Sequence, residues 1–308
     1  MSNVSQIIEE RPSDIGNFLV GRLLPFKNKR SVGPFVFIDH MGPVQLSSKE
    51  NFDIGPHPHI GLSTLTYLFE GAVMHRDSLG TEIEILPGQV NWMTAGKGIV
   101  HSERTPERLR NSDKNMHGLQ IWVALPKELE QMEPSFHHVE AAQLPTWKEG
   151  NTMYRLVAGE IMGKKSAVPV YSPLYLLEIK TVEACEINLG EHLYGEAGLY
   201  ILDGKIETEG QAFLPKQLLV AKNSKLCTFK MAENSTVYIF GGKPFDEPRR
   251  IYWNFVATTP ELIENAKERW KNQEFDKVPG ETGYIPLPED FNNFKLKKEN
   301  NDNENTAF

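Results

Sequence analysis

The sequence predicts an all-β protein made of two similar barrels, followed by one short helix. Three observations lead to this prediction: apolar and polar residues alternate over short segments, turn residues separate these segments, and part of the pattern occurs twice. Side chains of an extended strand point alternately to its two faces, so the alternation marks strands with one buried face. Many short strands joined by tight turns are typical of a barrel or a sandwich.

The first predicted barrel covers residues 1–134. Alternation is clear at 65–69, 90–94 and 119–123, and turn signals such as Pro87-Gly88 lie between these segments. A polar stretch at 126–145 interrupts the rhythm and is the candidate linker. His137 and His138 lie in this stretch, and adjacent residues on an extended chain point to opposite faces, so they are expected at its surface and not as paired ligands.

The second predicted barrel, in residues 135–290, partly repeats the first. Residues 67–71 (YLFEG) resemble 200–204 (YILDG), and residues 86–90 (LPGQV) resemble 214–218 (LPKQL). A repeat of this kind indicates a duplicated structural unit. Because an internal repeat already gives each barrel a partner, we expect a monomer.

A helix is expected at 259–272, within the second region. Leu262, Ile263, Ala266 and Trp270 recur at helical spacing and form one apolar face. Thr259 before Pro260 suits a cap followed by proline, whereas Thr258 with Glu261 suits a capping box, and the sequence leaves both open. Residues 291–308 are polar and are expected to form a disordered tail.

Composition narrows the class of protein. The 308-residue chain has a net charge of −8 and no basic stripe, so we expect no direct binding to nucleic acid. No apolar run approaches the roughly 20 residues that span a bilayer, and the N-terminus lacks a signal-peptide core, so no membrane association is expected. Two cysteines cannot build a disulfide framework, which suits a reducing cytoplasm.

Two short motifs carry the chemistry, His57-Pro58-His59 and His101-Ser102-Glu103. Residues two apart on an extended chain share a face, so each motif aims two side chains in one direction. On adjacent strands inside a barrel, three imidazoles and one carboxylate would converge, and borderline divalent metals accept these ligands. His-x-His also occurs among ordinary core histidines, and Pro58 suits a strand edge, so spacing alone leaves both interpretations open.

Several long segments resemble the pirin family of the cupin superfamily. They are GPFVFIDHMGP (33–43), PHPHIGLSTLTYLFEG (56–71), HRDSLG (75–80), LPGQVNWMTAGKGIVHSE (86–103), HGLQIWVALP (117–126) and GGKPFDEPRRIYWNFVATTPELIENAKERW (241–270). The resemblance implies a bicupin, two jelly-roll-like barrels stacked face to face. It also implies one metal ion in the first barrel, iron in this family, held by His57, His59, His101 and Glu103.

The repeat agrees with a single metal. Counting along it aligns the four ligand positions with four residues of the second barrel: Gly190, His192, Phe229 and Met231. One imidazole cannot hold a metal, so the second barrel is expected to be a structural partner. Three imidazoles and a carboxylate would also accept manganese, cobalt, nickel, copper or zinc, so the sequence leaves the identity of the ion open.

The resemblance implies two classes of function. Several pirins resemble the cupin quercetinases, which open a flavonol ring with dioxygen and release carbon monoxide. In that case Glu103 would be both ligand and base, and the partners would be a flavonol-like aromatic and O2. Pirins also act as iron-dependent regulators that bind transcription factors, and this alternative needs a protein partner and no dedicated substrate. A cupin isomerase is a weaker alternative.

The remaining polar residues of interest are expected to make structural hydrogen bonds, since buried polar groups are normally paired. These residues are Asp39, His40, His75, Asp77 and His117. Gln120 and Trp122 alternate with the apolar residues of their strand. They therefore face either the solvent or the barrel interior, and in the interior they would line the mouth of the pocket.

Overall fold

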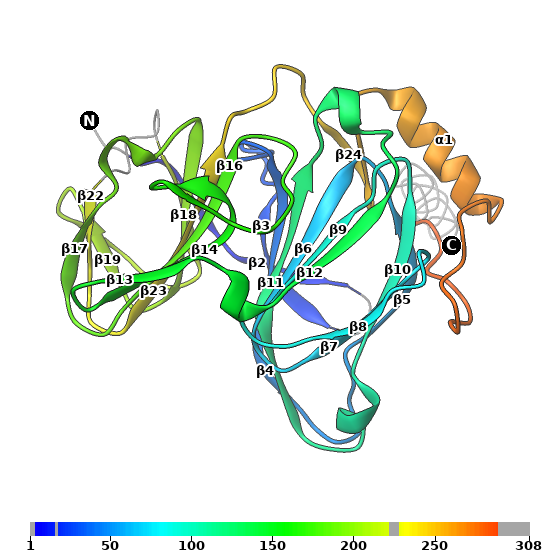
Figure 1. Cartoon of the computed structure of the whole chain (residues 1–308), viewed down its shortest axis with the longest axis horizontal. Helices are drawn as coiled ribbons and strands as arrows, with labels where there is room; N and C mark the ends of the chain where they lie inside the picture. Colours follow the sequence, from blue (N-terminus) through cyan, green and yellow to red (C-terminus); the bar gives the residue numbers. More distant parts are fainter. Residues whose placement is uncertain (1–3, 16–17, 222–227, 289–308) are drawn as a thin grey trace, which may run out of the picture.

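The computed structural model describes residues 4–15, 18–221 and 228–288. Within these ranges, two barrels of antiparallel strands lie side by side, and one α-helix lies at the outer edge of the first barrel (Figure 1). The predicted all-β fold class with a short C-terminal helix is confirmed. The tail predicted at 291–308 lies outside the described residues.

The first barrel consists of a large and a small sheet. The large sheet has the order β12-β9-β6-β11-β4-β3-β2, and the small one β5-β10-β7-β8. Their strands are β2 (Arg11–Asp14), β3 (Leu19–Leu24), β4 (Phe35–Leu46), β5 (Asp53–His59), β6 (Leu62–Glu70), β7 (Val73–Asp77), β8 (Glu82–Ile85), β9 (Val90–Thr94), β10 (Ile99–Arg104), β11 (Lys114–Ala124) and β12 (Ser135–Val139). Short 3-10 turns follow β10 at Glu107–Leu109 and β11 at Lys127–Leu129.

The second barrel repeats this plan. Its large sheet has the order β1-β21-β18-β23-β16-β14-β13 with β15 beside β14, and its small sheet the order β17-β22-β19-β20. The strands are β1 (Val4–Glu9), β13 (Thr146–Glu149), β14 (Thr152–Ile161), β15 (Lys164–Lys165), β16 (Leu174–Thr181), β17 (Cys185–Asn188), β18 (Glu196–Asp203), β19 (Ile206–Thr208), β20 (Gln211–Phe213), β21 (Gln217–Ala221), β22 (Thr228–Met231) and β23 (Ser235–Gly242). Further 3-10 turns lie at Ala141–Gln143 and Gly190–His192.

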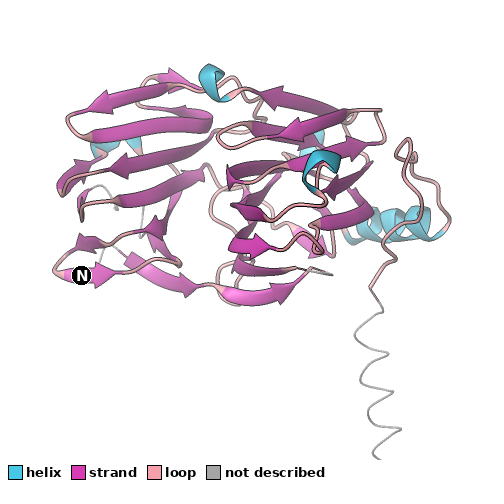
Figure 2. Cartoon of the chain, turned by 90° about the horizontal axis from the view of Figure 1, so that it is seen from below, coloured by secondary structure: helices cyan, strands magenta, loops and turns pink. Residues whose placement is uncertain are grey.

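The two large sheets pack against each other. Leu65 and Ile121 of the first barrel belong to the same buried apolar cluster as Leu176, Tyr200 and Tyr238 of the second. Seen from below, the two groups of strands lie next to each other, with the helix at one outer edge (Figure 2). The apolar face of each large sheet is therefore buried by the other barrel, and its opposite face is left to line a barrel interior.

Each end of the described chain packs against the barrel that is formed mainly by the other half of the sequence. Strand β1 pairs with β21 of the second barrel, although it comes first in the sequence. At the other end, β24 (Arg250–Tyr252), β25 (Phe255–Ala257) and α1 (Pro260–Lys271) lie against the first barrel. Trp270 of the helix packs in one cluster with Ile60 and Val100 of the first barrel. Each barrel thus contains a segment from the far end of the chain.

The structure corrects the candidate linker at 126–145. This stretch contains β12, which pairs with β9 in the large sheet of the first barrel. His137 is exposed, as expected, but His138 Nδ1 lies 2.7 Å from Asn91 Oδ1. Since β12 and β1 each pair with strands on the other side of the predicted boundary, the division at residue 134 remains a proposal.

The helix begins at Pro260, and Thr259 occupies the N-cap position. This settles the choice between the two predicted starts, because proline at the first helical position loses no hydrogen bond there. The hydroxyl of Thr258 instead donates to Glu130 Oε1 at 2.6 Å. Within the described residues, α1 and the other helical segments are too short or too polar to cross a membrane.

We predict that Ile8→Ala lowers the free energy of unfolding by about 2–5 kcal/mol, the usual cost of truncating a buried isoleucine. Ile8 is 0% exposed and belongs to the cluster between the barrels. Urea denaturation would measure the change. Ile7→Ala is the matched control, because Ile7 is 40% exposed on the opposite face of the same strand. A control loss within about 0.5 kcal/mol is expected, and equal losses would contradict the role of β1 in the core.

Candidate metal centre

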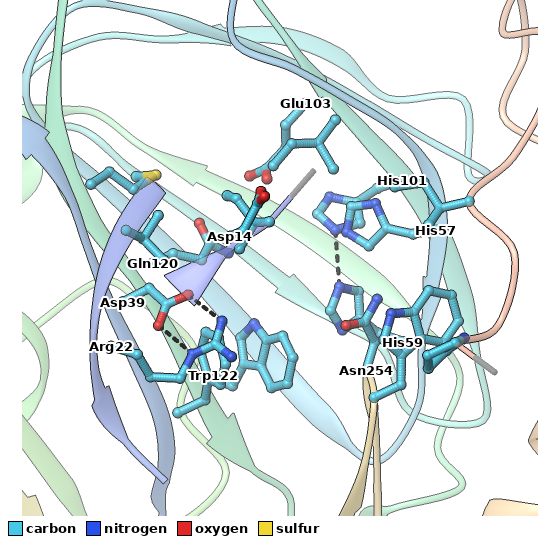
Figure 3. A pocket seen from close by; sticks show the side chains of 18 of the residues that line it. Asp14, Arg22, Asp39, His57, His59, His101, Glu103, Gln120, Trp122 and Asn254 are labelled. Carbon is cyan, nitrogen blue, oxygen red and sulfur yellow. Dashed lines mark hydrogen bonds and ion pairs between the residues drawn. The ribbon is translucent and has the colours of Figure 1, made fainter. Parts of the chain in front are cut away.

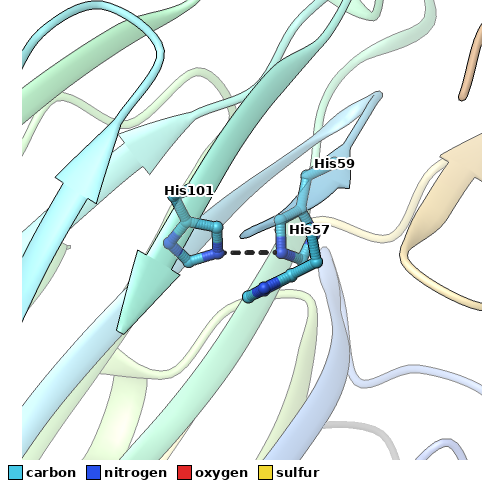
Figure 4. A group of neighbouring side chains, drawn as sticks. All are labelled: His57, His59 and His101. Carbon is cyan, nitrogen blue, oxygen red and sulfur yellow. Dashed lines mark hydrogen bonds between the residues drawn. The ribbon is translucent and has the colours of Figure 1, made fainter. Parts of the chain in front are cut away.

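Strands β5 and β10 bring the two predicted motifs together. They pair side by side in the small sheet of the first barrel, with His101 opposite His57 and Ile99 opposite His59. The ligand nitrogens of His57, His59 and His101 all lie within 4.8 Å of one another, and all three side chains are buried (Figure 4). We call these three residues the histidine cluster.

The ring nitrogens of the cluster face its centre. His59 Nε2 and His101 Nε2 are 3.1 Å apart. Two nitrogen ligands bound at about 2.1 Å to one ion, at right angles, would be separated by about 3.0 Å. The Nδ1 N–H of His57 donates to the carbonyl oxygen of Gly55 at 2.8 Å, which leaves its Nε2 free to accept. The cluster therefore fits a divalent metal ion.

Burial keeps these imidazoles neutral. It lowers the pKa of His57 to about 4 and the pKa values of His59 and His101 well below their usual range. Removal from water disfavours the charged form of histidine, and neighbouring imidazoles add to this effect. A neutral imidazole keeps the lone pair that a metal ligand needs, so the cluster is ready for a cation at neutral pH.

Glu103 lies in the same pocket as the cluster, on the strand that carries His101. Its Oε1 is 3.4 Å from the hydroxyl of Thr66, which in turn lies 2.9 Å from Gln120 Oε1. Burial raises the pKa of Glu103 to about 7. Three of the four predicted side chains are thus clustered, and the fourth faces the same cavity without joining that group.

A cavity of about 460 Å³ opens beside the cluster, and one of its walls is aromatic. The rings of Phe37 and Trp122 stack with centroids 3.9 Å apart. The Trp122 ring meets that of His59 edge to face (Figure 3). Arg22 lies over Phe37 and makes two hydrogen bonds of 2.8 Å to Asp39. Of the two predicted alternatives for Gln120 and Trp122, the interior one is therefore correct.

A segment near the end of the described chain forms another wall of the cavity. We call residues 279–288 the C-terminal strap. Glu281 accepts hydrogen bonds from Ser102 and Arg104, each at 2.8 Å, and Ile285 N–H donates to the carbonyl of Pro56 at 2.8 Å. Ile285, Pro286 and Pro288 line the cavity. Sequence patterns did not predict this contact, because the strap has no strand or helix periodicity.

The interior of the second barrel is apolar at the corresponding place. Phe229 lies opposite Ile187 in the register of β22 with β17, as His101 lies opposite His57 in that of β10 with β5. Both residues belong to the buried core of this barrel, together with Met231. Counting along the repeat correctly aligned β10 with β22. The alignment of His59 with His192 was wrong, because His192 lies beyond β17 in an exposed turn.

The predicted structural hydrogen bonds are also present. His40 Nε2 lies 2.9 Å from His117 Nε2, and its Nδ1 lies 2.6 Å from Glu10 Oε1. Tyr200 of the second barrel joins this group through a hydrogen bond to Glu10. The contact between His75 and His101 was not foreseen, because it depends on how β7 registers with β10.

Two cupin barrels packed face to face, with a buried histidine cluster inside the first, define a bicupin with a candidate metal centre. The Pirin family model matches residues 17–123, and the model of the pirin C-terminal cupin domain matches residues 176–276. The chain belongs to the pirin family, as its sequence motifs predicted.

Known proteins resemble the chain over most of its length. A pirin-like protein of Caulobacter vibrioides is 47% identical, over 93% of this chain and 100% of that protein. The crystal structure of a quercetin 2,3-dioxygenase from Acinetobacter baumannii has a TM-score of 0.83 and 34% identity, covering 92% of this chain and 94% of that one. A bacterial pirin from Escherichia coli, solved with nickel(II), shares the fold at 19% identity and a TM-score of 0.61, over 78% of this chain and 99% of its own.

We predict that His101→Ala and His59→Ala each lower metal content by more than about tenfold, because either change removes one of three clustered nitrogens. Metal analysis after loading and desalting would measure this. His192→Ala is the control and should leave the content unchanged, since His192 lies in the turn at Gly190–His192 of the second barrel. If both cluster variants retained one ion per chain, this site would be excluded.

Proposed function

We propose that this protein is a metal-dependent dioxygenase of the quercetin 2,3-dioxygenase type. In this proposal His57, His59, His101 and Glu103 hold one iron(II) ion. The observation that carries it is the direct opening of a buried, neutral histidine cluster onto a cavity with a flat aromatic wall. The resemblance to the quercetin 2,3-dioxygenase of Acinetobacter baumannii supports the same reaction class.

The cavity suits a flat aromatic substrate with several hydroxyl groups. Its volume of about 460 Å³ lies in the range of small-molecule sites. The stacked rings of Phe37 and Trp122 offer an apolar surface for a flavonol ring. Gln120, Arg22 and Asp39 line the same cavity and can form hydrogen bonds with hydroxyl groups. Shape and polarity therefore agree with a flavonol.

A bound iron(II) ion would supply the Lewis-acid and redox chemistry by which dioxygen reacts with a flavonol. Glu103 would accept the proton of the flavonol hydroxyl, since it is a buried carboxylate facing the cavity. The hydroxyl of Thr66 lies within 3.4 Å and can orient that carboxylate. The C-terminal strap and Trp122 would keep water from the reacting ring. In the balanced reaction, one flavonol and one O2 give the ring-opened ester and one carbon monoxide.

We predict that the iron-loaded protein consumes oxygen and releases carbon monoxide when quercetin is added, in equal amounts. His101→Ala should reduce the rate to background, because the metal is lost. His192→Ala should match the parent protein. An oxygen electrode together with gas chromatography would measure both gases. A fully iron-loaded protein that consumes no oxygen would exclude the quercetinase reaction and favour the alternative class, a metal-dependent protein-binding regulator.

Glu103→Gln separates the two roles given to this residue. If Glu103 acts only as a base, the variant should have a lower maximal rate and an iron content near one per chain, because the amide cannot accept the proton. If Glu103 is both ligand and base, the variant should have a lower maximal rate and a lower iron content. We predict that both fall, and that metal analysis and oxygen uptake on the same sample show it. Unchanged iron content would remove Glu103 from the ligand set.

A further inference from the structure

A line of three buried side chains runs from the histidine cluster to the neighbouring strand β7. Asp77 and His75 lie on β7, which pairs with β10 on the side away from β5. Asp77 is 0% exposed and His75 is 4% exposed. His75 Nε2 lies 3.2 Å from Asp77 Oδ2, and His75 Nδ1 lies 3.4 Å from His101 Nδ1. Neither Asp77 nor His75 belongs to the four predicted ligands.

The contacts of Asp77 fix the direction of its hydrogen bonds. Its Oδ1 accepts the backbone N–H groups of Leu79 at 2.9 Å and Thr81 at 3.0 Å. An ionised carboxylate only accepts hydrogen bonds, so the contact at Oδ2 requires a proton on His75 Nε2. The ring of His75 also stacks on Phe136, with centroids 4.5 Å apart, which restricts its rotation.

When His75 is uncharged, its proton on Nε2 decides which nitrogen of His101 carries a proton. A neutral imidazole with a proton on Nε2 carries a lone pair on Nδ1. That lone pair faces His101 Nδ1, so His101 must hold its own proton there. The lone pair of His101 then lies on Nε2, the atom that faces His59 inside the cluster. The order of protons from Asp77 to His101 thus presents the lone pair of His101 to a metal.

We infer that Asp77 and His75 are positioning residues that set the tautomer and orientation of His101 for metal binding. The inference rests on the metal site of the proposed function and does not depend on the substrate. His57 has a simpler arrangement with the same effect, in which its Nδ1 N–H donates to the carbonyl of Gly55. In both cases the outer nitrogen is held as a donor and the inner nitrogen is left to accept.

Asp77→Asn is the most informative variant because it keeps the shape of the side chain. The carbonyl oxygen of the introduced asparagine can still accept from the turn, but its amide would donate toward His75 Nε2. His75 would then carry its proton on Nδ1, and His101 would have to accept at Nδ1 and hold its proton on Nε2. The variant therefore reverses the order of protons. A purely structural role predicts little effect from so small a change.

Two variants of His75 complete the set. His75→Phe removes the acceptor for His101 Nδ1 and keeps an aromatic ring against Phe136. His75→Gln offers an oxygen toward His101 and an amide toward Asp77, so it preserves the order of protons. Arg76→Gln is the control on the same strand, because Arg76 is on the opposite face from His75. Arg76 pairs with Glu82 at 2.7 Å and lies 3.9 Å from Glu281 of the strap, which Ser102 and Arg104 hold in place without it.

The test measures the affinity of the metal-free protein for cobalt(II) by competition with a chromophoric chelator. Outer hydrogen-bonding partners of metal ligands typically change affinity by about 10–100-fold. We expect a loss in that range for Asp77→Asn and His75→Phe, a smaller loss for His75→Gln, and parent affinity for Arg76→Gln. Nitrogen NMR of the metal-free protein should show His101 protonated on Nδ1 in the parent and on Nε2 in Asp77→Asn.

Parent affinity in both Asp77→Asn and His75→Phe would overturn the inference, as would an unchanged His101 tautomer in Asp77→Asn. Failure of the metal site itself gives a different result, in which the parent protein binds no cobalt or His101→Ala binds it as well as the parent. Urea denaturation of each metal-free variant separates a lost positioning contact from a damaged fold. An affinity loss with an unchanged unfolding midpoint supports positioning.

Discussion

The packing of one large sheet against the other determines where the candidate metal site and its cavity lie. On β11, Leu119 and Ile121 point into the apolar cluster shared by the two barrels. The residues between and beside them, Gln120 and Trp122, must then face the interior of the first barrel and line its cavity. The same alternation on β6 buries Leu65 between the sheets and turns Thr66 toward Glu103. The second barrel is thus the support against which the pocket is built.

The duplicated barrels use equivalent positions for opposite purposes. In the second barrel, Phe229 and Met231 fill the interior with apolar side chains, a packing that stabilises the fold without any ligand. In the first barrel, His101 and Glu103 stand on the equivalent strand, where burial opposes the charged form of each. Buried polar groups cost stability unless they are paired, so the candidate metal site lowers the stability of the first barrel.

The sequence was sufficient for the features that depend on neighbouring residues. Alternation located the strands, and the two-residue spacing of His57 and His59 predicted a shared face. Features that join distant segments were missed, among them the pairing of β1 with β21 and the strap at Glu281. Their residues are compatible with many partners, and only the folded chain selects one. The contact of His75 with His101 has the same cause, because a shift of β7 by one residue would turn His75 away.

Because of its position along the chain, the strap is synthesised after the histidine cluster. All three clustered histidines leave the ribosome well before Ile285, which lines one wall of the cavity. A nascent chain therefore has the cluster before it has this wall, and an ion bound at the proposed site could reach the cluster from that side. Once Glu281 accepts hydrogen bonds from Ser102 and Arg104, the strap covers this side of the cavity, and an ion at the proposed site would have to leave by another route. At the proposed site, the metal would then be selected during synthesis, and the folded strap would help to retain it.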